Sequence, residues 1–218
     1  KRVNGQWTIA VPPDAGGEVA AISPNGKFII GNRAWEVVQW DENFVESSLG
    51  YPLGETMHSP TGTNDAGGVC GLAGSFFDGG PNAMVRSDAQ SPWLYILPHL
   101  TERGIDTTGT WMIVSNWISP DGDAVSGWGM GPLGFSQGFL VRELLPRAKG
   151  QVTLGQYGQT PAGQKVSVTV TNEAGDTVLK EADAVLDGQG KFAVKVGYGF
   201  VTGTFDVVVK ASHWLSAR

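Results

Sequence analysis

A short motif occurs three times in this chain and strongly limits what the chain can fold into. The copies are Ile22-Ser-Pro-Asn-Gly26-Lys-Phe-Ile-Ile-Gly31, Thr63-Asn-Asp-Ala-Gly67-Gly-Val-Cys-Gly71 and Ile118-Ser-Pro-Asp-Gly122-Asp-Ala-Val-Ser-Gly127. Each copy begins with a β-branched residue and Ser or Asn, turns at a glycine, and continues through apolar residues to a second glycine. Such a unit predicts two antiparallel strands joined by a tight turn, and its repetition predicts a modular β architecture.

The residues expected to form the repeat turns are Asn25, Gly26, Gly67, Asp121 and Gly122. Asn and Asp accept local backbone hydrogen bonds, and glycine takes positive φ without steric cost. The first glycines of successive copies lie 41 and 55 residues apart. Periods of this order, with about four strands each, are typical of propeller blades. We therefore expect an all-β fold with about three propeller-like blades.

Beyond residue 148 the motif stops and strict alternation of apolar and polar residues begins, as in Val166-Ser-Val-Thr-Val-Thr171 and Phe205-Asp-Val-Val-Val-Lys210. Period-two alternation predicts strands with one buried and one solvated face. We expect a propeller-like domain at 1–147 and an antiparallel β-sandwich of six or seven strands at 150–218. The one expected helix lies around Leu97–Arg103 and ends at Gly104.

Composition excludes some classes of partner. The net charge is −6 and no cluster of Lys and Arg is present, so a nucleic-acid-binding surface is not expected. No apolar run approaches the roughly 18 residues that a membrane-spanning helix needs. Cys70 is the single cysteine and lies in an apolar strand, where a buried, inert thiol is favoured over a reactive one.

The N-terminal repeats resemble the HAF-repeat family of bacterial extracellular proteins, whose repeats are predicted propeller blades. Ile118 to Gly127 followed by Gly138-Phe139 matches the family phrase well, whereas Ala34-Trp35 and Ala83-Met84 depart from its Ala-Phe. The segment from Val152 to Leu215, with Pro161-Ala162-Gly163 and the ending Lys210-Ala-Ser-His-Trp-Leu215, resembles a small β-sandwich module of planctomycete-like and related secreted bacterial proteins. Both resemblances imply secretion or a cell-surface location, and neither supplies catalytic residues.

Three blades are too few to close a propeller, since closed examples have typically four to eight. We therefore expect the ring to be completed by further N-terminal blades or by copies of this chain. The sequence starts with strand-like residues rather than a signal peptide, which suggests a mature or trimmed chain. Trp7, Ile9 and Val11 alternate in the first strand-like segment and are the candidates for assembly.

No residue set indicates a catalytic, metal or cofactor site. Asp14, Asp65 and Asp121-Gly-Asp123 could suggest calcium, but a full loop motif is missing and turn chemistry explains them better. The three histidines are far apart in sequence, the glycine-rich run 127–131 lacks the features of a phosphate loop, and no Gly-x-Ser-x-Gly elbow is present. We expect no enzyme activity and no cofactor.

Tryptophans are the remaining feature of interest, with Trp93, Trp111, Trp117 and Trp128 clustered in the second and third repeats. Core packing is the favoured role for tryptophans that recur in blades. Trp128, in the glycine-rich loop predicted between strands, is the best candidate for an exposed ring that stacks on a glycan.

These features predict a secreted or surface-attached structural or adhesive protein that self-associates through sheet edges and blade faces. The alternative is a carbohydrate-binding module of a cell-wall or biofilm protein, with a polysaccharide as partner. A weaker alternative is the non-catalytic part of a secreted hydrolase.

Overall fold

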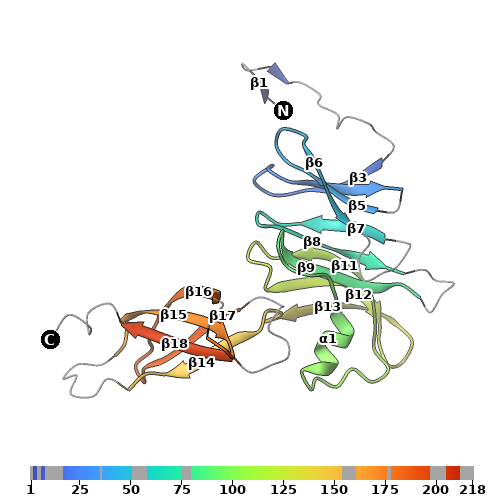
Figure 1. Cartoon of the computed structure of the whole chain (residues 1–218). Coiled ribbons are helices and arrows are strands. Elements are labelled where there is room, and N and C mark those ends of the chain that lie inside the picture. The colour runs from blue at the N-terminus through green and yellow to red at the C-terminus, as the bar shows by residue number, and fades with distance from the viewer. Residues whose placement is uncertain are drawn as a thin grey trace. The chain divides into compact units, whose positions relative to one another are not determined.

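The computed structural model describes residues 2–3, 6–7, 17–34, 36–50, 58–74, 80–153, 161–175, 178–196 and 205–211. These residues form an all-β chain with one short helix, as predicted (Figure 1). Contacts divide the chain into unit 1, Lys1–Leu144, and unit 2, Leu145–Arg218. Unit 1 has the consecutive antiparallel sheets of a partial propeller, and unit 2 is a small antiparallel sandwich.

Unit 1 contains three successive sheets, which we name blades 1, 2 and 3. Blade 1 comprises β3 (Gly17–Ile22), β4 (Ile29–Arg33), β5 (Glu36–Trp40) and β6 (Glu46–Gly50). Blade 2 comprises β7 (His58–Thr63), β8 (Gly67–Ala73), β9 (Asn82–Asp88) and β10 (Leu94–Tyr95). Blade 3 comprises β11 (Trp111–Ile118), β12 (Ala124–Met130) and β13 (Ser136–Arg142). A short pair, β1 (Arg2–Val3) and β2 (Gln6–Trp7), precedes them.

The repeated motif forms the turn between the first two strands of each blade. In blade 1 the Ser23 N–H donates to the Phe28 carbonyl at 2.8 Å, and the Gly26 N–H donates to the Ser23 carbonyl at 2.8 Å. The Asn25 Oδ1 accepts the Lys27 N–H at 2.9 Å. Gly26 has φ +73°, a conformation that disfavours any residue with a Cβ.

The other two copies form related turns. In blade 3 the Gly122 N–H donates to the Ser119 carbonyl at 2.9 Å, and the Asp121 carboxylate accepts the Asp123 N–H at 3.2 Å. In blade 2 the turn is one residue shorter, because the Asn64 N–H bonds to the Gly68 carbonyl four positions later. Gly67 and Gly122 have φ +75° and +71°. The shorter turn explains why the two glycines of the second copy lie closer together in sequence.

The second glycine of each copy admits a carbonyl oxygen of the preceding strand. A Cβ added at Gly31, Gly71 or Gly127 would lie 1.9, 2.3 and 2.0 Å from the carbonyl oxygens of Glu18, Ser59 and Val114 respectively. In all three blades the first strand bulges immediately after the residue opposite this glycine. The three blades therefore share one register, and equivalent positions can be compared residue by residue.

Blades stack in chain order, so each has a preceding face and a following face, named for the neighbouring blade that each would contact. Ile30 and Val37 on the following face of blade 1 pack against Val69, Ala73 and Met84 of blade 2. Two amides of blade 1 reach blade 2 carbonyls: Asn32 Nδ2 donates to His58 O at 2.9 Å, and Gln39 Nε2 donates to Gly67 O at 3.3 Å.

Blade 3 is joined to blade 2 by a buried serine. The Ser115 hydroxyl accepts the Gly71 N–H at 2.9 Å and lies 2.7 Å from the Met84 carbonyl oxygen, while its residue is 0% exposed. The turns add a further link, since Asn64 Nδ2 donates to the Ser119 carbonyl at 3.0 Å. The Ser115 hydroxyl thereby supplies an acceptor to the buried Gly71 N–H, as buried backbone donors require.

In the chain, helix α1 (Ile96–Glu102) connects β10 of blade 2 to β11 of blade 3. The sequence had predicted a helix around Leu97–Arg103, which is shifted by one residue from the observed range. Gly104, at φ +78°, donates its N–H to the Thr101 carbonyl and ends the helix. His99 is 4% exposed and its Nε2 lies 3.0 Å from the Leu144 carbonyl oxygen, so the helix is fixed to the segment that follows β13.

Unit 2 is described by five strands in two sheets. β14 (Arg147–Gln151) pairs with β17 (Lys191–Lys195), and β15 (Lys165–Asn172) lies between β16 (Val178–Val185) and β18 (Phe205–Ala211). The apolar residues of both sheets form one core, made of Val166, Val168, Val170, Ala184, Leu186, Phe192, Val194 and Val196. The described residues thus hold five of the six or seven strands that alternation had predicted.

Candidate functional site

The side chains considered as catalytic or metal-binding candidates have structural environments. His58 and His99 are 2% and 4% exposed, and Asp121 accepts hydrogen bonds within its turn. Burial raises the pKa of the Cys70 thiol to about 12, so it carries no thiolate at neutral pH. Among the described residues, no three His, Cys, Asp or Glu side chains are grouped as metal ligands would be. His213 and Asp14 lie outside the described residues.

Trp128 lies in the middle of strand β12, so its assignment to a loop was wrong. Loop character was inferred from the glycines on either side, Gly127 and Gly129, but these admit the Val114 and Trp111 carbonyl oxygens of the adjoining strand. The ring is 40% exposed, and Trp128 pairs with Gly138 of β13, which places no side chain beside it.

Three large apolar side chains share the uncovered following face of blade 3. Trp117 is 49% exposed, Trp128 40% and Leu140 53%. The register places them together, because Ser126 pairs with both Trp117 and Leu140 and lies two residues before Trp128 on the same strand. We call Trp117, Trp128 and Leu140 the tryptophan face.

The equivalent positions in blades 1 and 2 are covered by the next blade. In blade 2, Leu140 corresponds to Val85, which is 0% exposed, and in blade 1 it corresponds to Gln39, which is 6% exposed. Trp128 corresponds to Asn32, the residue whose amide reaches blade 2. The tryptophan face therefore occupies the positions that contact the following blade elsewhere in the stack.

The other end of the stack shows the complementary pattern. Val19 and Ile22, on the preceding face of blade 1, are 57% and 60% exposed. Their equivalents in blade 3, Ser115 and Ile118, are 0% and 3% exposed against blade 2. Both ends of the stack thus expose some positions that are buried wherever two blades meet, while Val38 and Trp40 in the middle of the preceding face of blade 1 are buried, at 0% and 3% exposed.

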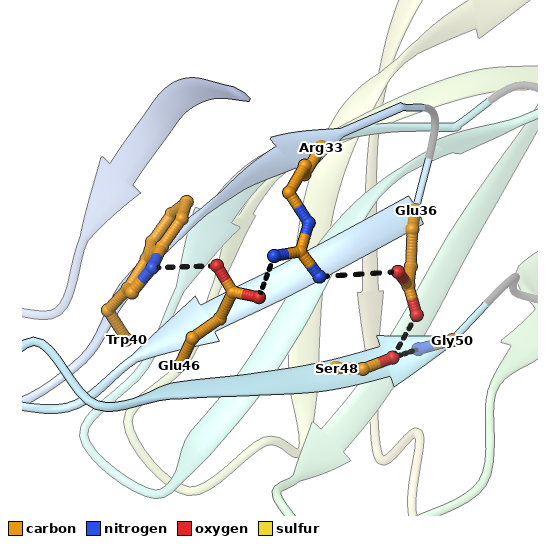
Figure 2. Close-up of polar contacts among 6 residues, drawn as sticks. All are labelled: Arg33, Glu36, Trp40, Glu46, Ser48 and Gly50. Carbon is orange, nitrogen blue, oxygen red and sulfur yellow. Dashed lines mark hydrogen bonds and ion pairs between the residues drawn. The ribbon is translucent and has the colours of Figure 1, made fainter. Parts of the chain in front are cut away.

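A polar network crosses the same preceding face of blade 1 (Figure 2). Arg33 contacts Glu46 at 2.6 Å and Glu36 at 3.9 Å, and the Trp40 indole N–H donates to Glu46 at 3.1 Å. The Ser48 hydroxyl donates to Glu36. The arrangement fixes the side chains of three neighbouring strands in register, and it offers no unpaired carboxylate for catalysis.

The residues predicted to mediate assembly are only partly described. Trp7 ends strand β2, and Ile9 and Val11 lie outside the described residues. Sequence analysis did not single out Trp117 as exposed. Aligning the three motif copies could have found it, since Trp117 takes the place of Ala21 and Gly62 on the following face.

Comparisons with known proteins add little. No family model matches the chain, and no curated protein matches it. One solved structure, described as a TolB from Agrobacterium tumefaciens, aligns with 85% of this chain at 16% identity and a TM-score of 0.35. The chain spans 60% of the length of that structure, and a likeness this distant carries no argument. In the described residues, no helix has the length and apolarity that crossing a membrane requires.

Proposed function

We propose that this chain is a secreted or surface-attached bacterial structural protein that self-associates by stacking the blades of neighbouring copies. The observation that carries the proposal is the contrast in exposure at equivalent positions. Leu140, Val19 and Ile22 are exposed at the two ends of the stack, while Val85, Ser115 and Ile118 are buried between blades. At a contact formed as blade 2 packs on blade 1, the tryptophan face of one copy and the preceding face of blade 1 of the next copy cover each other.

The contact joins two different surfaces, the tryptophan face of one copy and the preceding face of blade 1 of the next. Such a head-to-tail contact is heterologous and produces either a closed ring or an extended assembly. Fully burying a large apolar side chain contributes about 1.5–3 kcal/mol, and the side chains at this contact are about half exposed, so each contributes roughly half of that. Trp128 and Trp117 are of the residue type that most often dominates interface energetics.

The test is the mass of the purified chain by light scattering over a range of concentrations. We expect a mass well above 23.0 kDa for the wild type, and a shift toward 23.0 kDa for Trp128→Ala and Trp117→Ala. Leu133→Ala is the matched control, because Leu133 is 80% exposed but lies in the β12–β13 turn rather than on the tryptophan face. A wild type that stays at the mass of one chain at high concentration contradicts the proposal.

Glycan binding is the second candidate, supported by the exposed ring of Trp128 and the missing side chain at Gly138 beside it. An aromatic face open on one side can stack on a sugar ring. Retention on a polysaccharide array that is lost in Trp128→Ala and kept in Leu133→Ala would favour this function. Equal retention of all three proteins would exclude Trp128 as the binding residue.

A further inference from the structure

The turn of blade 1 contains an Asn-Gly dipeptide, Asn25-Gly26, whose side chain and backbone can react with each other. Both residues are exposed, and a Cβ added at Gly26 would meet no atom within 4 Å, so water reaches the linkage between them. Glycine also leaves its own backbone nitrogen unhindered, because it has no Cβ. The dipeptide therefore has the composition and the exposure that spontaneous deamidation requires.

Deamidation at this dipeptide consumes only water. The Gly26 nitrogen, after losing its proton, attacks Asn25 Cγ, so that a new C–N bond forms. The bond from Cγ to the side-chain amide nitrogen breaks, and ammonia leaves with the proton. Water then opens the succinimide ring. Attack of water at Cγ gives aspartate at position 25, and attack at the main-chain carbonyl carbon gives isoaspartate, in which the main chain passes through Cγ.

The folded turn restrains both reacting groups. The Gly26 N–H donates to the Ser23 carbonyl at 2.8 Å, which holds the proton that has to leave. Asn25 Oδ1 accepts the Ser23 hydroxyl at 2.8 Å and the Lys27 N–H at 2.9 Å, which fixes the orientation of the side-chain amide. Ring closure therefore requires that the turn open first and that these hydrogen bonds break.

The turn of blade 2 adds a contact from outside. The Asn25 N–H donates to Asp65 Oδ1 at 2.8 Å, and Asp65 lies 40 positions later in the chain, in the second copy of the motif. Local opening has its own free energy, which rises with the number of contacts that must break. The rate of reaction at Asn25 should therefore depend on the contact between the turns of blades 1 and 2.

We propose that Asn25 is a deamidation site whose rate of reaction is controlled by local opening of the blade 1 turn. This inference does not depend on the proposed function, since the reacting groups and the hydrogen bonds that restrain them lie within one chain. The reaction is irreversible, so it changes the contact between the turns of blades 1 and 2 permanently.

The two products differ in their effect on the turn. Blade 3 already has an aspartate at the equivalent position, where the Asp121 carboxylate accepts the Ser119 hydroxyl at 2.6 Å. Aspartate at position 25 can therefore keep the hydrogen bonds that Asn25 makes. Isoaspartate lengthens the main chain by the Cβ atom, which displaces the Gly26 N–H from its acceptor. Isoaspartate is thus the product that loosens the contact between the two turns.

Mass spectrometry of the full chain, aged at mildly alkaline pH, tests the site. Cleavage after Glu18 and Glu36 gives a peptide that contains Asn25 and excludes Asn4-Gly5, the other Asn-Gly dipeptide of the chain. We expect deamidation at Asn25 to be at least about tenfold slower in the folded chain than in the same chain unfolded in guanidinium chloride.

Matched variants distinguish local opening from global unfolding. Ser23→Ala removes a donor to Asn25 Oδ1, and Asp65→Ala removes the acceptor that blade 2 supplies. Each should raise the rate in the folded chain about threefold or more, as the loss of one hydrogen bond predicts. Ser115→Ala is the control, because it weakens the contact between blades 2 and 3 without touching the turn, and it should leave the rate at Asn25 unchanged.

Each alternative outcome removes one part of the proposal. An unfolded chain that does not deamidate at Asn25 overturns the site itself, and equal rates in the folded and unfolded chains overturn protection by the turn. Unchanged rates in Ser23→Ala and Asp65→Ala overturn control by these hydrogen bonds. If Ser115→Ala accelerates the reaction as much as Ser23→Ala does, the reaction follows global unfolding, and local control is overturned.

Discussion

Blades 1 and 3 have the same register and the same type of turn, yet they end the stack differently. The preceding face of blade 1 is held by ion pairs and hydrogen bonds around Arg33, and its sheet has a fourth strand, β6. The following face of blade 3 carries two half-exposed tryptophans, and its described sheet ends at β13. Equivalent backbone positions are therefore buried between blades or exposed at an end of the stack, and the side chains placed there differ accordingly.

The comparison indicates how function is added to a repeat fold. Glycines and turn residues are the same type at equivalent positions because backbone geometry requires them. Face residues differ, as at one equivalent position where the covered face of blade 2 carries the buried Val85 and the end face of blade 3 carries the half-exposed Leu140. Under the proposed function, the positions where the repeats differ are the ones that join neighbouring copies.

The largest expected effect concerns a glycine of blade 3 that lies against a carbonyl oxygen of the adjoining strand. Gly127→Ala places a Cβ 2.0 Å from the Val114 carbonyl oxygen, so we expect a loss of about 3 kcal/mol in the free energy of unfolding. Gly138→Ala is the control, because its nearest atom, the Gly127 carbonyl oxygen, is 3.8 Å away. Urea unfolding of both variants measures the difference, and equal stabilities would contradict the shared glycine role.

The next effect compares an interior blade contact with an end position. Ser115→Ala leaves the buried Gly71 N–H without its 2.9 Å acceptor, and we expect a loss of about 2 kcal/mol. Ser126→Ala, on the following face of blade 3, is expected to change the stability by less than about 0.5 kcal/mol. Thermal unfolding at matched concentrations distinguishes the two, and a larger effect at Ser126 would reverse the assignment of interior and end.

The segment after blade 3 should respond to pH through His99. Burial lowers the pKa of His99 below its ordinary 6.5, with nearby Arg103 acting in the same direction and the Leu144 carbonyl and Glu102 opposing. At a pH between the pKa values of His99 in the folded and the unfolded chain, the unfolded chain then binds more protons than the folded chain. The stabilising contribution is full above pH 6.5 and is lost as the pH falls toward the folded pKa. Unfolding measured from pH 8 to 5 shows this slope, and His99→Gln should remove it.

The smallest effect concerns the polar network of blade 1. Arg33→Ala removes both ion pairs, but its side chain is 42% exposed, so we expect a loss of no more than about 1 kcal/mol. The loss should shrink in high salt, because exposed ion pairs are screened. Lys27→Ala, in the exposed turn of the same blade, is the control. If the loss caused by Arg33→Ala does not change with salt, the ion pairs are not screened as their exposure predicts, and this prediction is wrong.

Local features of the fold were predictable from sequence. The repeat turns, the helix that ends at Gly104 and the alternating strands of unit 2 all follow from residues that are close together in the chain. The expected fold class, propeller-like sheets followed by a sandwich, depended only on these signals. Trp128 was misplaced because glycines near it were taken as turn residues, whereas a neighbouring strand requires them.

The candidate site was only partly predictable. Trp128 was named as the exposed ring, but Trp117 was grouped with core tryptophans, although it is 49% exposed. Exposure depends on whether a following blade covers the position, and this is known only once the packing of the sheets is known. The same holds for β13, which ends the described sheet of blade 3 after three strands, whereas the sheets of blades 1 and 2 have four.

The sequence by itself determined where the backbone turns and which strands pair, because φ angles, side-chain periodicity and adjacent hydrogen bonds act over a few residues. Only the tertiary structure decided which faces are covered, since burial depends on contacts between blades that are about 40 to 55 residues apart in the chain. Ser115 illustrates the difference: nothing beside it in sequence marks it as the hydroxyl that joins two blades. Side chains that act between repeats acquire their role when the repeats pack together.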